Sequence, residues 1–317
     1  DTSGASAAAG SAGDPGAVLF YGLAALLVFA PLYWGGNLPL PLMVMELTAL
    51  ALLVWRFWRP PGEGQPLSRT AWGFLALLFL LPLTQLLPVP MALWASLPGR
   101  SFYAGAFARA GDGGAGFEWR AISLIPTATE SAWLSLLPLL AVFLVVLDLT
   151  SRQVLRLVLV FLGIAVGEAL LGLIQYGDGP DSLFRLGNTF MSGSASGTYI
   201  NRNHLAGLLE MALPVGLALL AATVGHGRPW HSSGSRGRSG RTFRQWLARF
   251  SVARINQAAV FGAMSLAILL GLIFTRSRAG VSLAMTGILL CTLIFSYRLG
   301  GRNAYGLIGT FTAIGVG

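Results

Sequence analysis

Two short motifs that contain arginine carry the residues best suited to chemistry. NRNH at residues 201–204 opens a long apolar segment, and TRSRAG at residues 275–280 separates two others. Asn201 or Asn203 can cap a helix, whose free N–H groups favour an anion, and Arg202 adds a full positive charge there. The motif therefore predicts an anion site. An asparagine cap with Arg202 against a lipid phosphate explains the same residues equally well.

The second motif places Arg276 and Arg278 between two apolar runs, close to a membrane boundary. An arginine at the bilayer centre costs about 2.5–3.5 kcal/mol on insertion scales, and much less at the interface. Ala279 and Gly280 permit a tight reversal and close helix packing. Snorkelling to lipid headgroups is the simpler explanation, but two arginine motifs on one face favour a shared anionic ligand.

The elements that position these motifs are apolar helices. Of the 317 residues 55% are hydrophobic and 10% are charged, whereas soluble domains carry about 25% charged residues. Spans need roughly 20 apolar residues. We predict an all-α, polytopic integral membrane protein whose nine spans are approximately 17–34, 38–58, 71–88, 131–149, 154–176, 204–224, 257–275, 279–297 and 304–317. Residues 1–16 are predicted to be a disordered tail. The last span is short, so we expect the chain to continue beyond Gly317.

Arginine placement predicts the topology. The chain has a net charge of +9, and its 21 basic residues are all arginine. They concentrate in the loops after the second, fourth, sixth and eighth spans, which alternation puts on one side, and this bias marks the cytoplasm. The external loops are then 89–130, 177–203 and 275–279. Arg185, Arg202, Arg276 and Arg278 lie there against the bias. Arginines spread over loops in this way do not indicate a nucleic-acid partner.

Other features leave alternatives open. The basic loop 225–256 is either a topogenic loop attracted to anionic membrane lipids or an amphipathic interfacial helix. Thr127 and Glu130 resemble a capping box that opens a helix. Glu210, two turns after Arg202, either orients that arginine or is a buried acid. His204 is either a proton carrier or a local hydrogen-bonding group.

Metal and nucleotide chemistry have no support in the sequence. Cys291 is the single cysteine, and no cysteine and histidine framework accompanies it. The chain contains no P-loop, no dinucleotide fingerprint and no H-E-x-x-H motif. We therefore expect no metal and no cofactor.

Three segments resemble one family. GTYINRNHLAGLLEMALP, the later GLIFTRSRAGVSLAM and the upstream ISLIPTATESAWL are similar, in order and spacing, to segments of the O-antigen ligase and polymerase superfamily of bacterial membrane proteins. The resemblance covers roughly residues 119–290. It implies a multi-pass protein of the bacterial inner membrane with a periplasmic active face.

The implied activity is a metal-independent glycosyl transfer. Such enzymes take a glycan from an undecaprenyl diphosphate carrier and pass it to the lipid A core or to a growing polysaccharide. On this resemblance Arg278 and then Arg202 are the first candidates for catalysis, by binding the donor diphosphate. Asn203, Asn201, Arg276 and His204 complete the predicted donor site.

The family's acceptor-activating histidine lies in a later periplasmic loop, so we expect the general base beyond Gly317. Ligase and polymerase both remain open, since they share the donor site and differ at the acceptor. A transporter or flippase of an anionic lipid or solute is the alternative of another class.

Overall fold

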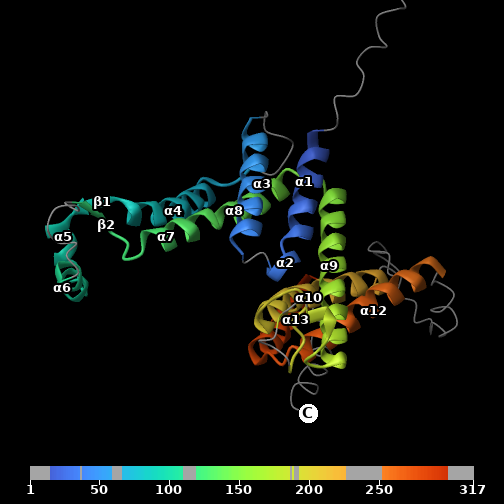
Figure 1. The fold of residues 1–317 in the computed structure, drawn as a ribbon. Helices are drawn as coiled ribbons and strands as arrows, with labels where there is room; N and C mark the ends of the chain where they lie inside the picture. Colours follow the sequence, from blue (N-terminus) through green and yellow to red (C-terminus); the bar gives the residue numbers. More distant parts are fainter. Residues whose placement is uncertain are drawn as a thin grey trace, which may run out of the picture. The chain divides into compact units, whose positions relative to one another are not determined.

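The computed structural model describes residues 15–35, 38–58, 66–109, 119–185, 188, 193–225 and 252–298. Its elements, shown in Figure 1, are α1 (Pro15–Phe29), α2 (Leu32–Gly35), α3 (Pro39–Phe57), α4 (Arg69–Leu86), β1 (Pro88–Pro90), α5 (Met91–Ser96), α6 (Ser101–Arg109), β2 (Trp119–Ala121), α7 (Pro126–Leu134), α8 (Leu136–Leu147), α9 (Ser151–Asp178), η1 (Leu183–Arg185), α10 (Arg202–Gly225), α12 (Val252–Phe274) and α13 (Arg278–Arg298). The described chain is all-α apart from the two short strands.

Six helices in the described ranges are long and apolar enough to cross a membrane. They are Pro39–Phe57, Arg69–Leu86, Pro126–Leu147, Ser151–Asp178, Arg202–Thr223 and Ile255–Phe274. Gly16–Phe29 and Arg278–Ile294 are apolar but shorter, and the predicted ninth span, 304–317, lies outside the described residues. A multi-pass membrane protein is therefore plausible, and the count of nine stays a prediction.

The chain forms two units. Unit 1 holds the residues up to Leu26 and Pro39–Val154, and unit 2 holds Leu27–Leu38 and Leu155–Gly317. The predicted tail lies outside the described residues up to position 14, and α1 begins at Pro15. Most of the basic loop 225–256, from residue 226 to 251, also lies outside them.

In unit 1, α3 packs against α8 and α4 packs against α7. Arg56 near the end of α3 pairs with Asp148 after α8, at 2.7 Å from Nε to Oδ2, and donates from Nε to the Leu144 carbonyl at 3.1 Å. The ends of these two helices therefore meet, as alternating spans require. No residue of α4 is buried, which suits a helix whose leucine and phenylalanine side chains face lipid.

A small lobe, formed by β1, α5, α6 and β2, connects α4 to α7, and Figure 1 shows it at the end of these two helices. We call it the α5–α6 lobe. Its strands pair antiparallel, with Val89 opposite Arg120. The predicted capping box at Thr127 and Glu130 is wrong. The N-cap of α7 is Ile125, without a side-chain hydrogen bond, because Pro126 already begins the helix and Thr127 lies inside it.

In unit 2, α10 packs against both α12 and α13. Their apolar core includes five side chains that are almost completely buried: Leu162, Leu205, Leu209, Ile268 and Leu272. Small residues set the helix spacing. A Cβ built on Gly271 of α12 would come within 2.7 Å of the Ala169 Cβ on α9, and one on Gly216 of α10 within 2.8 Å of Ser265 Oγ on α12. Such close contacts between helix backbones are typical of membrane bundles.

Candidate functional site

The first predicted motif forms the amino terminus of α10. Asn201 precedes the helix, and its Oδ1 accepts a hydrogen bond from the Asn203 backbone N–H at 2.9 Å. The predicted cap is therefore confirmed, with Asn201 as the capping residue. Arg202 is the first helical residue and is half-buried, whereas Asn203 and His204 are exposed.

The second predicted motif forms the amino terminus of α13. Three residues, Thr275–Ser277, separate it from α12. Ser277 Oγ accepts a hydrogen bond from the Gly280 N–H at 3.2 Å, and Thr275 Oγ1 accepts one from the Ser277 N–H at 3.2 Å. Arg278 begins the helix and is exposed. Like Arg202, it adds a full charge to the partial positive charge of a helix amino terminus.

These two amino termini lie side by side. A Cβ built on Gly280, in the first turn of α13, would come within 2.6 Å of the Ala206 Cβ on α10, in that helix's second turn. Glycine at 280 allows this approach. The backbone N–H groups in the first turns of α10 and α13, which have no partner within their own helices, therefore lie close to one another. Glu210 also reaches this crossing, with Oε2 3.4 Å from the same built atom, but it forms no ion pair with Arg202.

Arg276 occupies the apex of the turn between α12 and α13. Its φ of 54° is in the left-handed region, which is uncommon for a residue other than glycine, asparagine or aspartate. The guanidinium lies over the Tyr176 ring, 5.7 Å from its centroid, and Nη2 is 3.4 Å from the Tyr176 hydroxyl. Tyr176 in turn packs on Phe274 at 4.6 Å. Arg276 is exposed, but it is held against the end of α9.

The segment that leads into Asn201 is held by Gln175, which sequence reasoning did not select. This amide in α9 is fully buried. Its Nε2 donates to the carbonyls of Phe184 at 2.8 Å and Gly197 at 2.7 Å, and its Oε1 accepts from the Gly197 N–H at 2.9 Å. One side chain thus replaces the backbone partners that a loop lacks inside a protein.

Glu168, two helical turns before Gln175, binds Thr198, the residue that follows Gly197. Its Oε2 accepts from the Thr198 N–H at 2.9 Å and its Oε1 from the Thr198 hydroxyl at 2.8 Å. Gly197, with a φ of 59°, makes the turn, and a Cβ there would collide with the Glu168 carboxylate. Glu168 and Gln175 are seven residues apart on one helix, so both face the segment 193–200.

Arg185 also has a structural role in this segment. It is 3% exposed and donates to the backbone carbonyls of Gly179 at 2.9 Å and Gln175 at 2.9 Å. Asn188 donates to the carbonyls of Tyr199 and Ile200. The sequence predicted an external position for Arg185, against the arginine bias, but it did not predict that backbone carbonyls at the end of α9 would bind this side chain.

Tyr199 lies between this network and α10. Burial, and then the negative charge of Glu168, raise the pKa of the Tyr199 hydroxyl above its usual value. Its ring meets that of His204 edge-on, with centroids 6.5 Å apart. His204 thus has an aromatic neighbour, and no hydrogen bond from its imidazole is found among the described residues.

The arrangement suits an anion. Arg202, Arg276 and Arg278 form no ion pair with any acid in the described ranges, where Arg56 with Asp148 is the ion pair present. No group of three or more potential metal ligands occurs in those ranges either. The paired amino termini therefore present positive charge and N–H donors that protein carboxylates do not neutralise.

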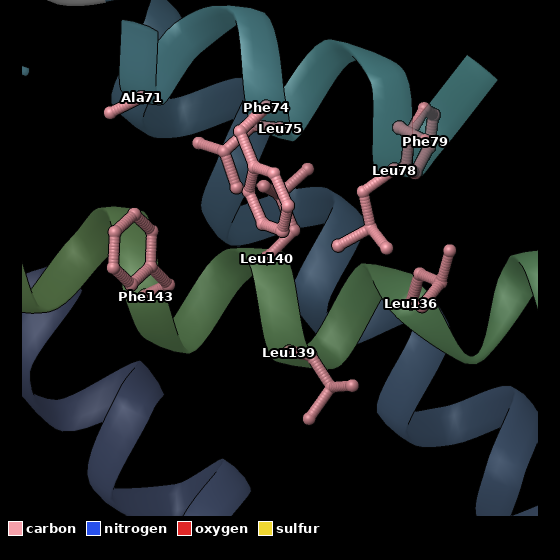
Figure 2. A pocket seen from close by; sticks show the side chains of 9 residues that line it. All are labelled: Ala71, Phe74, Leu75, Leu78, Phe79, Leu136, Leu139, Leu140 and Phe143. Atoms are coloured by element: carbon pink, nitrogen blue, oxygen red, sulfur yellow. The ribbon is translucent and has the colours of Figure 1, made fainter. Parts of the chain in front are cut away.

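The apolar groove that we describe belongs to unit 1. Nine apolar side chains of α4 and α8 line its volume of about 300 Å³ (Figure 2): Ala71, Phe74, Leu75, Leu78, Phe79, Leu136, Leu139, Leu140 and Phe143. It holds no group that could bind a charged ligand. The paired helix amino termini of unit 2 therefore remain the candidate site.

Neither a protein-family model, nor a curated protein, nor a solved structure matches this chain.

Proposed function

We propose that the chain binds a lipid diphosphate at the amino termini of α10 and α13, and transfers a glycan from it to an acceptor. The transfer takes place at the periplasmic face of a bacterial inner membrane, without a metal. The observation that carries the proposal is that two arginines, Arg202 and Arg278, each begin a helix, and that these helices cross within one to two turns of both arginines. The motif resemblance supplies the substrate class.

The chemistry follows from the leaving group. A diphosphate stays negatively charged when the sugar–oxygen bond breaks, and charge grows on the oxygen that departs. Guanidinium groups bind phosphate oxygens through two parallel N–H donors. Backbone N–H groups at a helix start add fixed donors that need no rearrangement during the reaction. Together they make the diphosphate a better leaving group.

The residues have separate roles in this proposal. Arg278 and Arg202 contact the diphosphate. The side-chain oxygens of Asn201 and Ser277 accept hydrogen bonds from backbone N–H groups in the first turns of α10 and α13, and so orient the remaining free N–H groups. Arg276, stacked on Tyr176, forms the outer wall of the site, and Asn203 and His204 line its exposed rim.

The experiment measures two steps. The first step is the binding of undecaprenyl diphosphate to the purified chain. The second is metal-free transfer of a glycan from undecaprenyl diphosphate to an acceptor. Both are measured for the unchanged protein, Arg278→Ala and Arg202→Ala. We expect each variant to weaken transfer by about a hundredfold or more, with a parallel loss of lipid diphosphate binding. Arg69→Ala is the matched control, because Arg69 also begins an apolar helix after a serine cap.

Different acceptors distinguish the activities. Lipid A core as the productive acceptor indicates a ligase, and a second glycan chain indicates a polymerase. Movement of the donor across liposomes without transfer indicates a flippase instead. If Arg278→Ala binds and transfers as well as Arg69→Ala does, the diphosphate site is wrong.

A further inference from the structure

The α5–α6 lobe contains two arginines beside one buried indole. The guanidinium carbon of Arg100 lies 4.6 Å from the Trp94 ring centroid, and that of Arg120 lies 5.4 Å from it. Arg120 also lies 3.6 Å from the Phe107 ring centroid. Trp94 is fully buried, and its Nε1 donates to the Ala121 carbonyl at 2.8 Å. The fixed rings therefore hold both positive charges in place.

Several donors of these arginines have no partner. Arg100 Nη2 donates to the Ile122 carbonyl, but Nη1 is buried without a hydrogen-bond partner. Arg120 makes no side-chain hydrogen bond or ion pair within the described ranges, while Asp112 and Glu118 lie outside them. Folding brings two like charges to one indole, and among the described residues it leaves N–H groups of these arginines unpaired. An anion that accepts from both guanidinium groups relieves both costs.

The candidate spans on either side of the lobe predict that it lies at the membrane surface, where lipid phosphates are abundant. It directly joins α4 to α7, and both belong to candidate membrane spans. Its surface exposes large aromatic side chains, with Phe102 76%, Trp119 57% and Tyr103 41% exposed. Aromatic side chains at the end of a span are typical of the headgroup region. The phosphate groups of the lipids are therefore expected at the same level of the membrane as the lobe.

We propose that Arg100 and Arg120 bind the phosphodiester of an anionic lipid headgroup, with Trp94 and Phe107 holding the two guanidinium groups. The site anchors the α5–α6 lobe to the membrane surface. It is independent of the function proposed for α10 and α13. A lipid is the source, rather than free phosphate, because the lobe and its exposed rings lie at the end of two spans.

The test measures lipid binding to the full chain in detergent by native mass spectrometry. Phosphatidylglycerol, phosphatidylcholine and inorganic phosphate are titrated separately. The proteins are the unchanged chain, Arg100→Gln, Arg120→Gln and the double variant. Arg109→Gln is the matched control, because Arg109 is an exposed arginine at the end of α6 with no stacking contact. Near-ultraviolet circular dichroism of the tryptophans checks that the lobe folds.

We expect each substitution to weaken phosphatidylglycerol binding about fivefold. The double variant should weaken phosphatidylglycerol binding by less than the product of the two single effects, because both arginines contact one phosphate. Arg120→Lys keeps the charge and the ring contact, and should lose affinity only in part, which separates binding from folding. Equal losses in Arg109→Gln and the double variant overturn the proposal. Inorganic phosphate or phosphatidylcholine that binds as tightly as phosphatidylglycerol overturns the choice of an anionic lipid.

Discussion

At the scale of the residue, polar side chains inside unit 2 organise the backbone. Gln175 and Arg185 donate to the carbonyls of Gly197 and Gly179 in the irregular chain between α9 and α10, and Glu168 accepts from Thr198. A buried loop needs such partners, because it has no helix or sheet of its own to satisfy its backbone groups. The candidate site therefore depends on residues that do not touch its ligand.

Gln175→Leu tests this dependence. The change keeps the size of the side chain and leaves buried groups of Ser196 and Gly197 without partners. We expect the free energy of unfolding to fall by about 1–3 kcal/mol, and binding of undecaprenyl diphosphate to weaken because Asn201 and Arg202 follow this segment. Denaturant unfolding in detergent measures the free energy of unfolding. Gln85→Leu is the control, since Gln85 is exposed, and equal destabilisation by both would contradict the role of Gln175.

At the scale of the element, close helix contact brings the two arginine motifs together. Gly280 meets Ala206 where α13 crosses α10, so the helix starts lie side by side. Each start is separately capped, one by Asn201 and one by Ser277. The sequence predicted an asparagine cap for α10 but no cap by Ser277, and the crossing depends on which glycine faces which alanine.

Gly280→Ala tests the crossing. The added methyl has to push α13 away from α10, so we expect a loss of about 1–3 kcal/mol in the free energy of unfolding. Gly207→Ala is the control. A Cβ there has no neighbour within 4 Å, and alanine favours the helix, so stability should hold or rise slightly.

Ala206→Gly should rescue Gly280→Ala, because it restores the missing space on the facing helix. Thermal unfolding of the single and double variants measures the coupling. Simple addition of the two single effects would show that the contact between these residues does not set the helix spacing.

At the scale of the whole molecule, the long apolar helices make a multi-pass membrane protein plausible, and the arginine bias predicts which loops share a side. Six helices in the described ranges qualify as spans, and the pairing of Arg56 with Asp148 joins the ends of α3 and α8. The side of the membrane on which each loop lies stays a prediction from the arginine counts.

Cysteine labelling measures those sides. Cys291 is the single native cysteine, so Cys291→Ser gives a background free of thiols. We expect an impermeant maleimide to modify Phe102→Cys from the periplasmic side and Ser151→Cys from the cytoplasmic side. Both positions are exposed and lie at opposite ends of the α7–α8 span. Labelling of both from the same side would overturn the topology.

The sequence by itself determined the apolar helices, an asparagine cap of α10 by Asn201 or Asn203, and the positions of the arginine motifs. These follow from local properties: residue type, periodicity and charge within about 20 neighbouring residues. It did not reveal the Gln175 network, the role of Arg185 or the stacking of two arginines on Trp94.

Only the tertiary structure decided these contacts. Gln175 meets Gly197 across 22 residues, and Gly280 of α13 meets Ala206 of α10, a helix far earlier in the chain. Such pairs depend on helix rotation and crossing, which small side chains set through packing rather than through any local pattern. The same packing places the helix starts that carry the two arginine motifs side by side.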